Sequence, residues 1–293
     1  MKWEDQGRSR NVEDRRGQAA PRRAGLPAGS LPIGIGGVVV LFVLSAVTGV
    51  DFLSLLGLGG GSGTGGGSTL PGGALPADVD VADEEEQVRF MSFVLDDLQD
   101  FWEEAFRRSD LGYPEATLVL YRDAVDSACG YAPSAVGPFY CPTDDSVYLD
   151  LSFYDELQHR YGAPGDFAQA YVLAHEIGHH VQNQLGYLAE SQRLQETDSS
   201  AANEVSVATE LMADCYAGVW AASVDSRGLL ERGDLEEGLQ AAAAVGDDTL
   251  ARRAGRIPNQ ETFTHGSAEQ RSGWFRTGFD SADPNACNTF DGL

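Results

Sequence analysis

The stretch AHEIGHHVQNQLG, residues 174–186, constrains the fold more than any other part of the chain. His175 and His179 are four residues apart, so they share one face of an α-helix and can both reach one metal ion. The flanking residues favour a helix, because Asp166 is a candidate cap for its first turn and Gly186 can end it. The pattern therefore predicts a zinc site built on a helix.

Two neighbouring polar residues have different expected roles. Glu176 lies about 100° around the helix from His175, beside the predicted metal, where it can take a proton from a zinc-bound water. His180 lies about 100° beyond His179 and points away from that metal, so we expect a structural role for it. The longer pattern HExxHxxGxxH is excluded, because positions 182 and 185 hold glutamine and leucine.

A third metal ligand has to come from another segment. In VATELMADCYAGVW, residues 207–220, Glu210 and Asp214 share one face of a strongly apolar helix, where unpaired carboxylates would be costly. We expect Glu210 to bind zinc and Asp214 to accept a hydrogen bond from the far ring nitrogen of His175 or His179. The alternative is that both carboxylates lie on the exposed edge of the helix.

An uncharged segment of eighteen residues, 33–50, would form a helix about 27 Å long, close to the roughly 30 Å core of a bilayer. We predict a single transmembrane helix within residues 32–56. Arginines precede the segment and acidic residues follow it, which places the N-terminus in the cytoplasm and the remainder outside the cell membrane. The alternatives are a cleaved signal peptide and a buried core helix.

Charge divides the chain into regions. Residues 1–31 hold seven Lys/Arg against four Asp/Glu, whereas the whole chain has a formal net charge of −25. We predict a disordered cytoplasmic tail at 1–31, a Gly/Ser-rich linker at 57–77 and one domain at 78–293.

So acidic a domain repels phosphates, and we expect no nucleic-acid partner. Composition does not predict the oligomeric state.

Inside the domain, a small sheet precedes a series of helices. Residues 84–106 carry apolar side chains at helical spacing and predict a long amphipathic helix. Residues 116–121 and 146–151 predict strands, and four or more helices follow them. The pattern favours an α+β fold that is predominantly helical. We expect the strand SVYLDL, residues 146–151, to be the edge with which an extended peptide pairs.

The four cysteines all follow the predicted membrane segment, and an even number outside the cytoplasm suggests two disulfides. The simplest of the three possible pairings joins Cys129 to Cys141 and Cys215 to Cys287. Free buried thiols are the alternative.

Three segments carry a resemblance to a known family: AHEIGHHVQNQLG, ELMADCYAGVWA and FTHGSAEQRSGWF, the last at residues 263–275. They resemble the bacterial "putative neutral zinc metallopeptidase" family, and NVEDRRG (11–17) and GPFYCPTDDSVYLDL (137–151) extend the likeness over nearly the whole chain. The chain is also similar, more distantly, to membrane-associated gluzincins. Departures such as Met212 touch no expected ligand.

The resemblance implies a zincin-like fold with zinc on His175, His179 and Glu210. In related gluzincins a histidine beyond the zinc helices stabilises the oxyanion. This implies a catalytic role for His265, with Arg271 nearby, ahead of a helix that Ser267 begins. The other interpretation is that His265 is a turn residue and that Arg271 pairs with an acidic neighbour.

These features together predict a membrane-anchored, zinc-dependent endopeptidase that cleaves a peptide or protein substrate with Glu176 as general base. The alternative is a noncatalytic zinc domain that binds a partner in the cell envelope. An intramembrane protease is disfavoured, because HEIGH lies far beyond the predicted span and is flanked by polar segments.

Overall fold

The computed structural model describes residues 1–18 and 84–291. The predicted transmembrane segment (32–56) and linker (57–77) lie outside the described residues. Among the residues that are described, no helix is both long and apolar enough to cross a bilayer. They form an α+β fold that is mostly helical and contains small sheets, as the sequence predicted.

The larger sheet has four strands in the order β1-β2-β6-β5. Its central strands, β2 (Thr117–Tyr121) and β6 (Ser146–Asp150), are parallel and correspond to the two predicted strands. The outer strands are β1 (Val12–Asp14), parallel to β2, and β5 (Phe139–Cys141), antiparallel to β6. The expectation that SVYLDL forms a sheet edge is therefore wrong. The edge strand on that side is β5.

Both faces of the sheet are covered, which explains the nearly continuous apolar sequence of its central strands. Leu118 and Leu120 of β2 join the main core with the helices, whereas Val119 and Tyr121 face a second cluster. The hairpin of β3 (Ala124–Ser127) and β4 (Gly130–Pro133) contributes to that second cluster.

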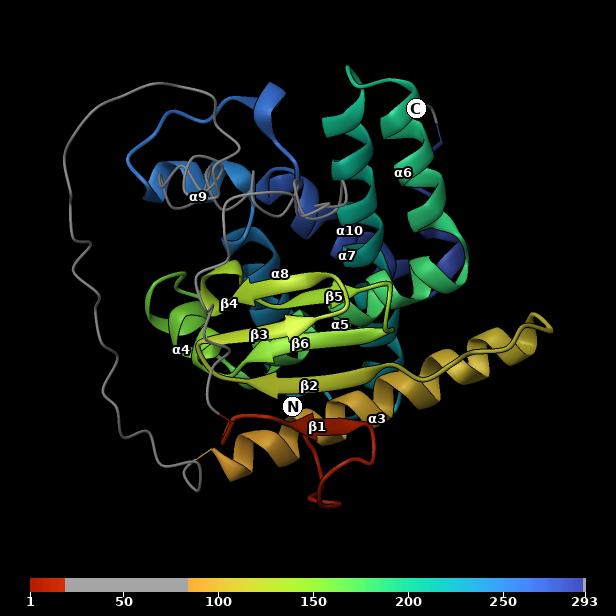
Figure 1. Cartoon of the computed structure of the whole chain (residues 1–293). Coiled ribbons are helices and arrows are strands. Elements are labelled where there is room, and N and C mark those ends of the chain that lie inside the picture. The colour runs from red at the N-terminus through yellow and green to blue at the C-terminus, as the bar shows by residue number, and fades with distance from the viewer. Residues whose placement is uncertain (19–83, 292–293) are drawn as a thin grey trace.

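The prediction of a disordered N-terminal tail is wrong for residues 1–18. Strand β1 pairs with β2 (Figure 1), and the side chain of Arg16 is fully buried, 2.8 Å from Asp14 and 2.8 Å from Glu84. The segment has no apolar periodicity because it is held by three residue pairs with β2 and by ion pairs between its arginines and acidic side chains. Composition alone gives no sign of such contacts.

The same strand pairing corrects the predicted topology. Residues 12–14 and 117–121 are hydrogen-bonded neighbours in one sheet, so both segments lie on the same side of any membrane. A tail in the cytoplasm and a domain outside it are incompatible with this fold.

One long helix precedes strands β2 to β6, and the other helices follow them. The helices are α3 (Glu85–Arg108), α4 (Ser152–His159), α5 (Asp166–Gln184), α6 (Tyr187–Thr197), α7 (Ala202–Ser226), α8 (Asp234–Ala244), α9 (Asp247–Arg253) and α10 (Ala268–Ser281), with 3₁₀ turns at Ser134–Val136, Gln260–Thr262 and Pro284–Cys287. In Figure 1 the helices α6, α7 and α10 gather beyond the β5 side of the sheet, and α3 lies beside β1 and β2.

Two of the expected helix signals are present and one is absent. Ser267 and Gln270 form a capping box at the start of α10, and Gly186 adopts a left-handed conformation just after α5. Asp166 does not cap α5, because it is the first helical residue and its carboxylate pairs with the N-terminal ammonium of Met1 at 2.6 Å.

Helices α7 and α10 approach each other unusually closely. A Cβ atom at Gly278 would overlap the carbonyl group of Cys215, and one at Gly218 would overlap that of Phe275. The disulfide between Cys215 and Cys287 ties α7 to the segment that follows α10. The predicted pairing is confirmed here and in the second disulfide, which joins Cys129 and Cys141.

We expect Arg16→Ala to lower the free energy of unfolding by about 2–4 kcal/mol, because it removes the fully buried arginine that Asp14 and Glu84 share and leaves these carboxylates only the more exposed Arg8 and Arg122. Arg10→Ala is the control. Its side chain is 79% exposed and pairs with Glu115, so its loss should cost at most about 1 kcal/mol. Urea unfolding of the full chain measures both values. Equal losses would show that residues 1–18 are not held in the fold as described.

We expect Gly278→Ala to lower the free energy of unfolding by about 1–3 kcal/mol, because the new methyl group meets backbone that cannot easily move. Gly273→Ala tests the same change in the same helix, but with open space around the Cβ position. There the better helix propensity of alanine should stabilise the protein by up to about 1 kcal/mol. Thermal and urea unfolding measure both changes in the free energy of unfolding, which should have opposite signs. A Gly278→Ala protein more stable than the unchanged chain would contradict the close approach of α10 to α7.

Candidate metal centre

Helices α5 and α7 bring together the three predicted metal ligands. His175 Nε2 lies 3.2 Å from Glu210 Oε2, and His179 Nε2 lies 3.5 Å from Glu210 Oε1. One ligand atom from each of these residues lies within 4.8 Å of the others. Two imidazoles and one carboxylate form the donor set of catalytic zinc sites, which leave a further position open. The residues therefore fit a zinc ion.

The second nitrogen of each imidazole is already engaged, which turns both Nε2 atoms toward Glu210. His175 Nδ1 lies 2.8 Å from Asp214 Oδ1, as predicted for the carboxylate of this helix. His179 Nδ1 lies 2.8 Å from Oε1 of Gln182, whose amide donates a hydrogen bond to the backbone of Thr209. Such contacts fix the orientation of a histidine ligand.

Gln182 was not predicted as part of the site. In the sequence it served only to exclude a longer histidine motif. Its contact with His179 could have been predicted from the spacing, because a residue three positions after His179 lies on the same face of α5. Its contact with Thr209 on α7 could not be inferred from that spacing.

Asp214 is completely buried and accepts hydrogen bonds from several directions. Arg271 Nε donates to its Oδ2 at 2.8 Å, and Tyr171 donates to its Oδ1. Burial acts to raise the pKa of Asp214, but Arg271 and His175 outweigh burial and hold that pKa below its usual value. For His175, burial acts to lower the pKa, and the Asp214 carboxylate raises it to about 9. Asp214 is thus a permanent anion that fixes the imidazole.

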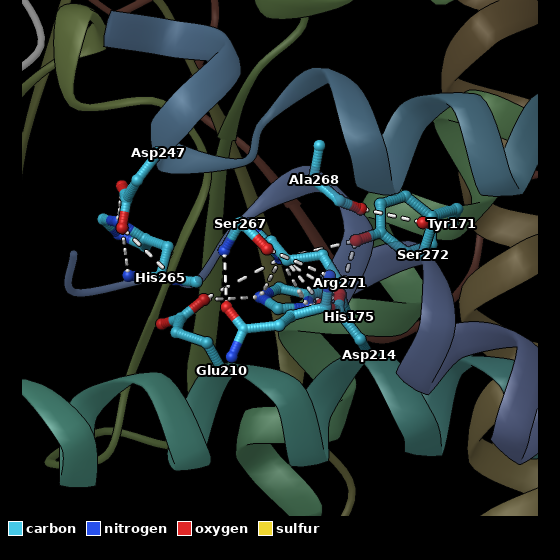
Figure 2. Close-up of polar contacts among 12 residues, drawn as sticks. Tyr171, His175, Glu210, Asp214, Asp247, His265, Ser267, Ala268, Arg271 and Ser272 are labelled. Carbon is cyan, nitrogen blue, oxygen red and sulfur yellow. Dashed lines mark hydrogen bonds and ion pairs between the residues drawn. The ribbon is translucent and has the colours of Figure 1, made fainter. Parts of the chain in front are cut away.

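Arg271 reaches the centre from α10. Its terminal nitrogen lies 3.2 Å from His175 Nδ1 and 3.8 Å from Glu210 Oε2, and its side chain is 5% exposed. Figure 2 shows Arg271 between Asp214, His175 and Glu210. Arg271 could have stood beside His265 at the oxyanion or paired with an acidic neighbour. The structure shows that it pairs with acidic residues.

His265 lies at the same cavity and is held by a carboxylate that the sequence did not reveal. Its Nδ1 atom lies 3.1 Å from Asp247 Oδ1, and the other oxygen of Asp247 accepts the backbone N–H groups of Thr264 and His265 at 2.7 Å each (Figure 2). Burial acts to lower the pKa of His265, but the hydrogen bond to Asp247 raises it above its usual value. His265 therefore lies at the cavity with its ring oriented by Asp247.

Glu176 lines the cavity together with the two histidines. It is 8% exposed, and this burial raises the pKa of its carboxyl group, partly opposed by His175 and His179. A raised pKa makes a carboxylate a stronger base, as proton transfer requires.

His180 faces away from the centre, as expected. Its Nδ1 lies 3.0 Å from the Tyr140 hydroxyl, and its Nε2 lies 2.7 Å from the carbonyl oxygen of Pro114. It joins α5 to the edge strand β5, which contains Tyr140.

The centre lies in a cavity of about 530 Å³. Its walls come from the turn at 134–138, β5, α4, α5, α6, α7 and the region of α9. A volume of this size suits a ligand of several residues or a small molecule.

Comparison with known proteins agrees with the site. The sequence model of the family described as "Putative neutral zinc metallopeptidase" matches residues 1–290, and the chain belongs to this family. It is 43% identical over 295 residues to the uncharacterized protein YpfJ of Escherichia coli K12, covering 99% of each chain. It is 45% identical over 190 residues to the uncharacterized protein Rv2575 of Mycobacterium tuberculosis H37Rv, covering 61% of this chain and 64% of that protein. No solved structure matches it.

We expect the purified chain to hold one zinc ion, which His175→Ala or Glu210→Ala removes or greatly weakens. The reason is that each substitution deletes one of three donors. His180→Ala is the matched control, because it removes a buried histidine of the same helix whose nitrogens bind Tyr140 and Pro114. Elemental analysis after dialysis measures the metal. A His180→Ala protein without zinc, beside a Glu210→Ala protein that keeps it, would overturn the assignment.

Proposed function

We propose that the protein is a zinc-dependent endopeptidase with Glu176 as general base. The observation that carries the proposal is that both histidine Nε2 atoms face Glu210 while Glu176 lines the same cavity. A structural zinc site needs no such additional carboxylate beside it.

Zinc bound by these ligands would polarise the scissile carbonyl and lower the pKa of the attacking water. Glu176 then accepts a proton from that water as the new C–O bond forms. It delivers the proton to the amine nitrogen as the C–N bond breaks, so that a peptide and a water yield a carboxyl and an amine product. The buried position of Glu176 suits both transfers, because burial raises the pKa of its carboxyl group and so strengthens it as a base.

His265 and Arg271 would support this chemistry in different ways. His265 lines the cavity with its Nδ1 side held by Asp247, which leaves its Nε2 side for an oxyanion. Arg271 holds Asp214 by two hydrogen bonds, of 2.8 and 3.0 Å, and so fixes the ring of His175. We assign Arg271 a positioning role and His265 an oxyanion role.

The substrate would be a peptide or protein segment in extended conformation. Strand β5 is the edge of the sheet, and its residues Phe139 and Tyr140 line the cavity. An extended segment can add to such an edge by main-chain hydrogen bonds. The disulfide at Cys141 and the contact between Tyr140 and His180 hold β5 in place for this.

The two disulfides support a location outside the cytoplasm, where such bonds persist. The substrate would then be a protein of the cell envelope or its surroundings. The formal charge of −25 speaks against a nucleic-acid substrate.

We expect Glu176→Gln to lower peptide hydrolysis by about 10²- to 10⁴-fold or more while zinc content and melting temperature stay unchanged. Glutamine has nearly the same size but cannot accept the proton. Glu156→Gln is the matched control, since this carboxylate lines the same cavity but is 50% exposed and pairs with Arg160. It should keep most of the activity.

Cleavage of a peptide library by the zinc-loaded full chain, followed by mass spectrometry, measures these rates. A Glu176→Gln protein that cuts at the rate of the unchanged chain would exclude the mechanism. If the zinc-loaded chain cuts no peptide, the noncatalytic envelope domain becomes the better explanation.

A further inference from the structure

A second cavity lies at the C-terminal end of α3. It has a volume of about 940 Å³, against about 530 Å³ for the cavity around the metal centre. Its walls are the second half of α3 with the turn after it, the junction of α5 and α6, part of α7, and the C-terminal segment at 282–288. Figure 1 shows this end of α3 projecting beyond the strands. Among the described residues none lines both cavities, and we call the second one the α3 groove.

The α3 groove has an aromatic floor and an exposed apolar rim. Trp102 of α3 and Tyr216 of α7 form the floor, where both are buried with their ring centroids 5.3 Å apart. Leu111 and Leu185 lie at the rim and are 50% and 40% exposed. In the described part of the chain four large apolar side chains are at least 40% exposed, and two of them therefore meet at this groove. A ligand that covered both leucines would gain from their burial.

The walls of the groove are held in place by contacts within the protein. Asp97 of α3 accepts a hydrogen bond of 2.8 Å from the indole of Trp220 on α7 and two more from Arg227, just after α7. The disulfide between Cys215 and Cys287 ties the C-terminal wall to α7. The groove is therefore preformed, and a ligand would lose little free energy in ordering it.

One carboxylate in the groove lacks a basic partner. Glu104 pairs with Arg108 at 2.8 Å, and Arg227 is held by its two hydrogen bonds to Asp97. Asp100 lines the groove but forms no hydrogen bond or ion pair with any residue that the structure describes. Burial and the neighbouring carboxylates of α3 raise the pKa of Asp100. A positive charge on a ligand would relieve the repulsion among these carboxylates.

We propose that the α3 groove binds a short basic segment of another protein, one that carries large apolar residues and at least one lysine or arginine. The apolar side chains cover Leu111 and Leu185 above the aromatic floor, and the basic side chain pairs with Asp100. The formal charge of −25 opposes a second copy of this chain or an anionic lipid surface at the same place. The inference does not depend on the proposed hydrolysis, because the groove and the metal centre are separate sites.

The first measurement selects peptides of about twelve residues from a randomised display library on the zinc-loaded Glu176→Gln protein, which should not cleave them. Peptides that also bind the same protein with Leu111→Ser and Leu185→Ser are removed, so that ligands of the metal centre do not dominate. We expect the remaining peptides to carry a net positive charge together with leucine, phenylalanine or tryptophan. Remaining peptides that are acidic or lack apolar residues, or the absence of any remaining peptide, would overturn the inference.

The second measurement tests the charge with a matched pair of variants, using fluorescence anisotropy and the most enriched peptide. Asp100→Arg should weaken binding at least about tenfold, because it replaces the attraction by repulsion inside the groove. Glu103→Arg makes the same change of charge on an exposed side chain of the same helix that does not line the groove. It should weaken binding less than about threefold, because solvent screens its charge. Equal effects of the two variants would show only general attraction to an acidic surface and would overturn the inference.

A further control shows whether the apolar rim is specific. Ile257 is 94% exposed and does not line the groove, so Ile257→Ser should leave the affinity for the peptide unchanged. Leu185→Ser alone should weaken binding about threefold or more. Melting temperature and zinc content confirm that all variants are folded. Weaker binding by the Ile257→Ser protein than by the Leu185→Ser protein would place the peptide outside the α3 groove and overturn the assignment.

Discussion

The buried pair of Asp214 and Arg271 is the interaction on which the arrangement of the helices depends. Asp214 is completely shielded from solvent and needs every one of its hydrogen-bond donors, because a buried carboxylate without partners is strongly unfavourable. Two hydrogen bonds come from α5, through His175 and Tyr171, and two more come from α10, through Arg271. Helices far apart in sequence are therefore joined at one carboxylate.

Delivering Arg271 to this point requires α10 to lie almost against α7. Glycines at the crossing make that possible, since side chains at Gly218 and Gly278 would overlap the opposite backbone. Helix α5 meets α7 by the same means, because a Cβ at Gly178 would lie 2.9 Å from the carbonyl oxygen of Ala213. The glycine within HEIGH thus serves packing, and it brings the histidines within reach of Glu210.

The sequence predicted the parts of the centre that depend on local geometry. The spacing of His175 and His179, and that of Glu210 and Asp214, is fixed by the helix itself, so each pair could be placed on one face. Asp247 could not be found in this way, because it lies eighteen residues before His265, with α9 and the 3₁₀ turn at Gln260–Thr262 between them. The N-terminal strand β1 was not predicted for a related reason. Its partner β2 lies about a hundred residues later, and its own sequence has no strand-like alternation. The position of β5 at the sheet edge likewise depends on strand order, which local patterns do not encode.

The formal charges around the centre give a physical reason for a divalent cation that is independent of the motif. Glu176, Glu210 and Asp214 bring three negative charges into a largely buried region, and Arg271 brings one positive charge. The nearby Asp247 carboxylate has His265 as its own partner, and this contact raises the pKa of His265 and lowers that of Asp247 although burial acts in the opposite direction on both. With both histidines neutral, as metal ligands must be, and with Glu176 ionised, two negative charges remain, which is costly in a region of low dielectric constant. A divalent cation held by His175, His179 and Glu210 would balance them and would favour the ionised form of Glu176 that acts as a base.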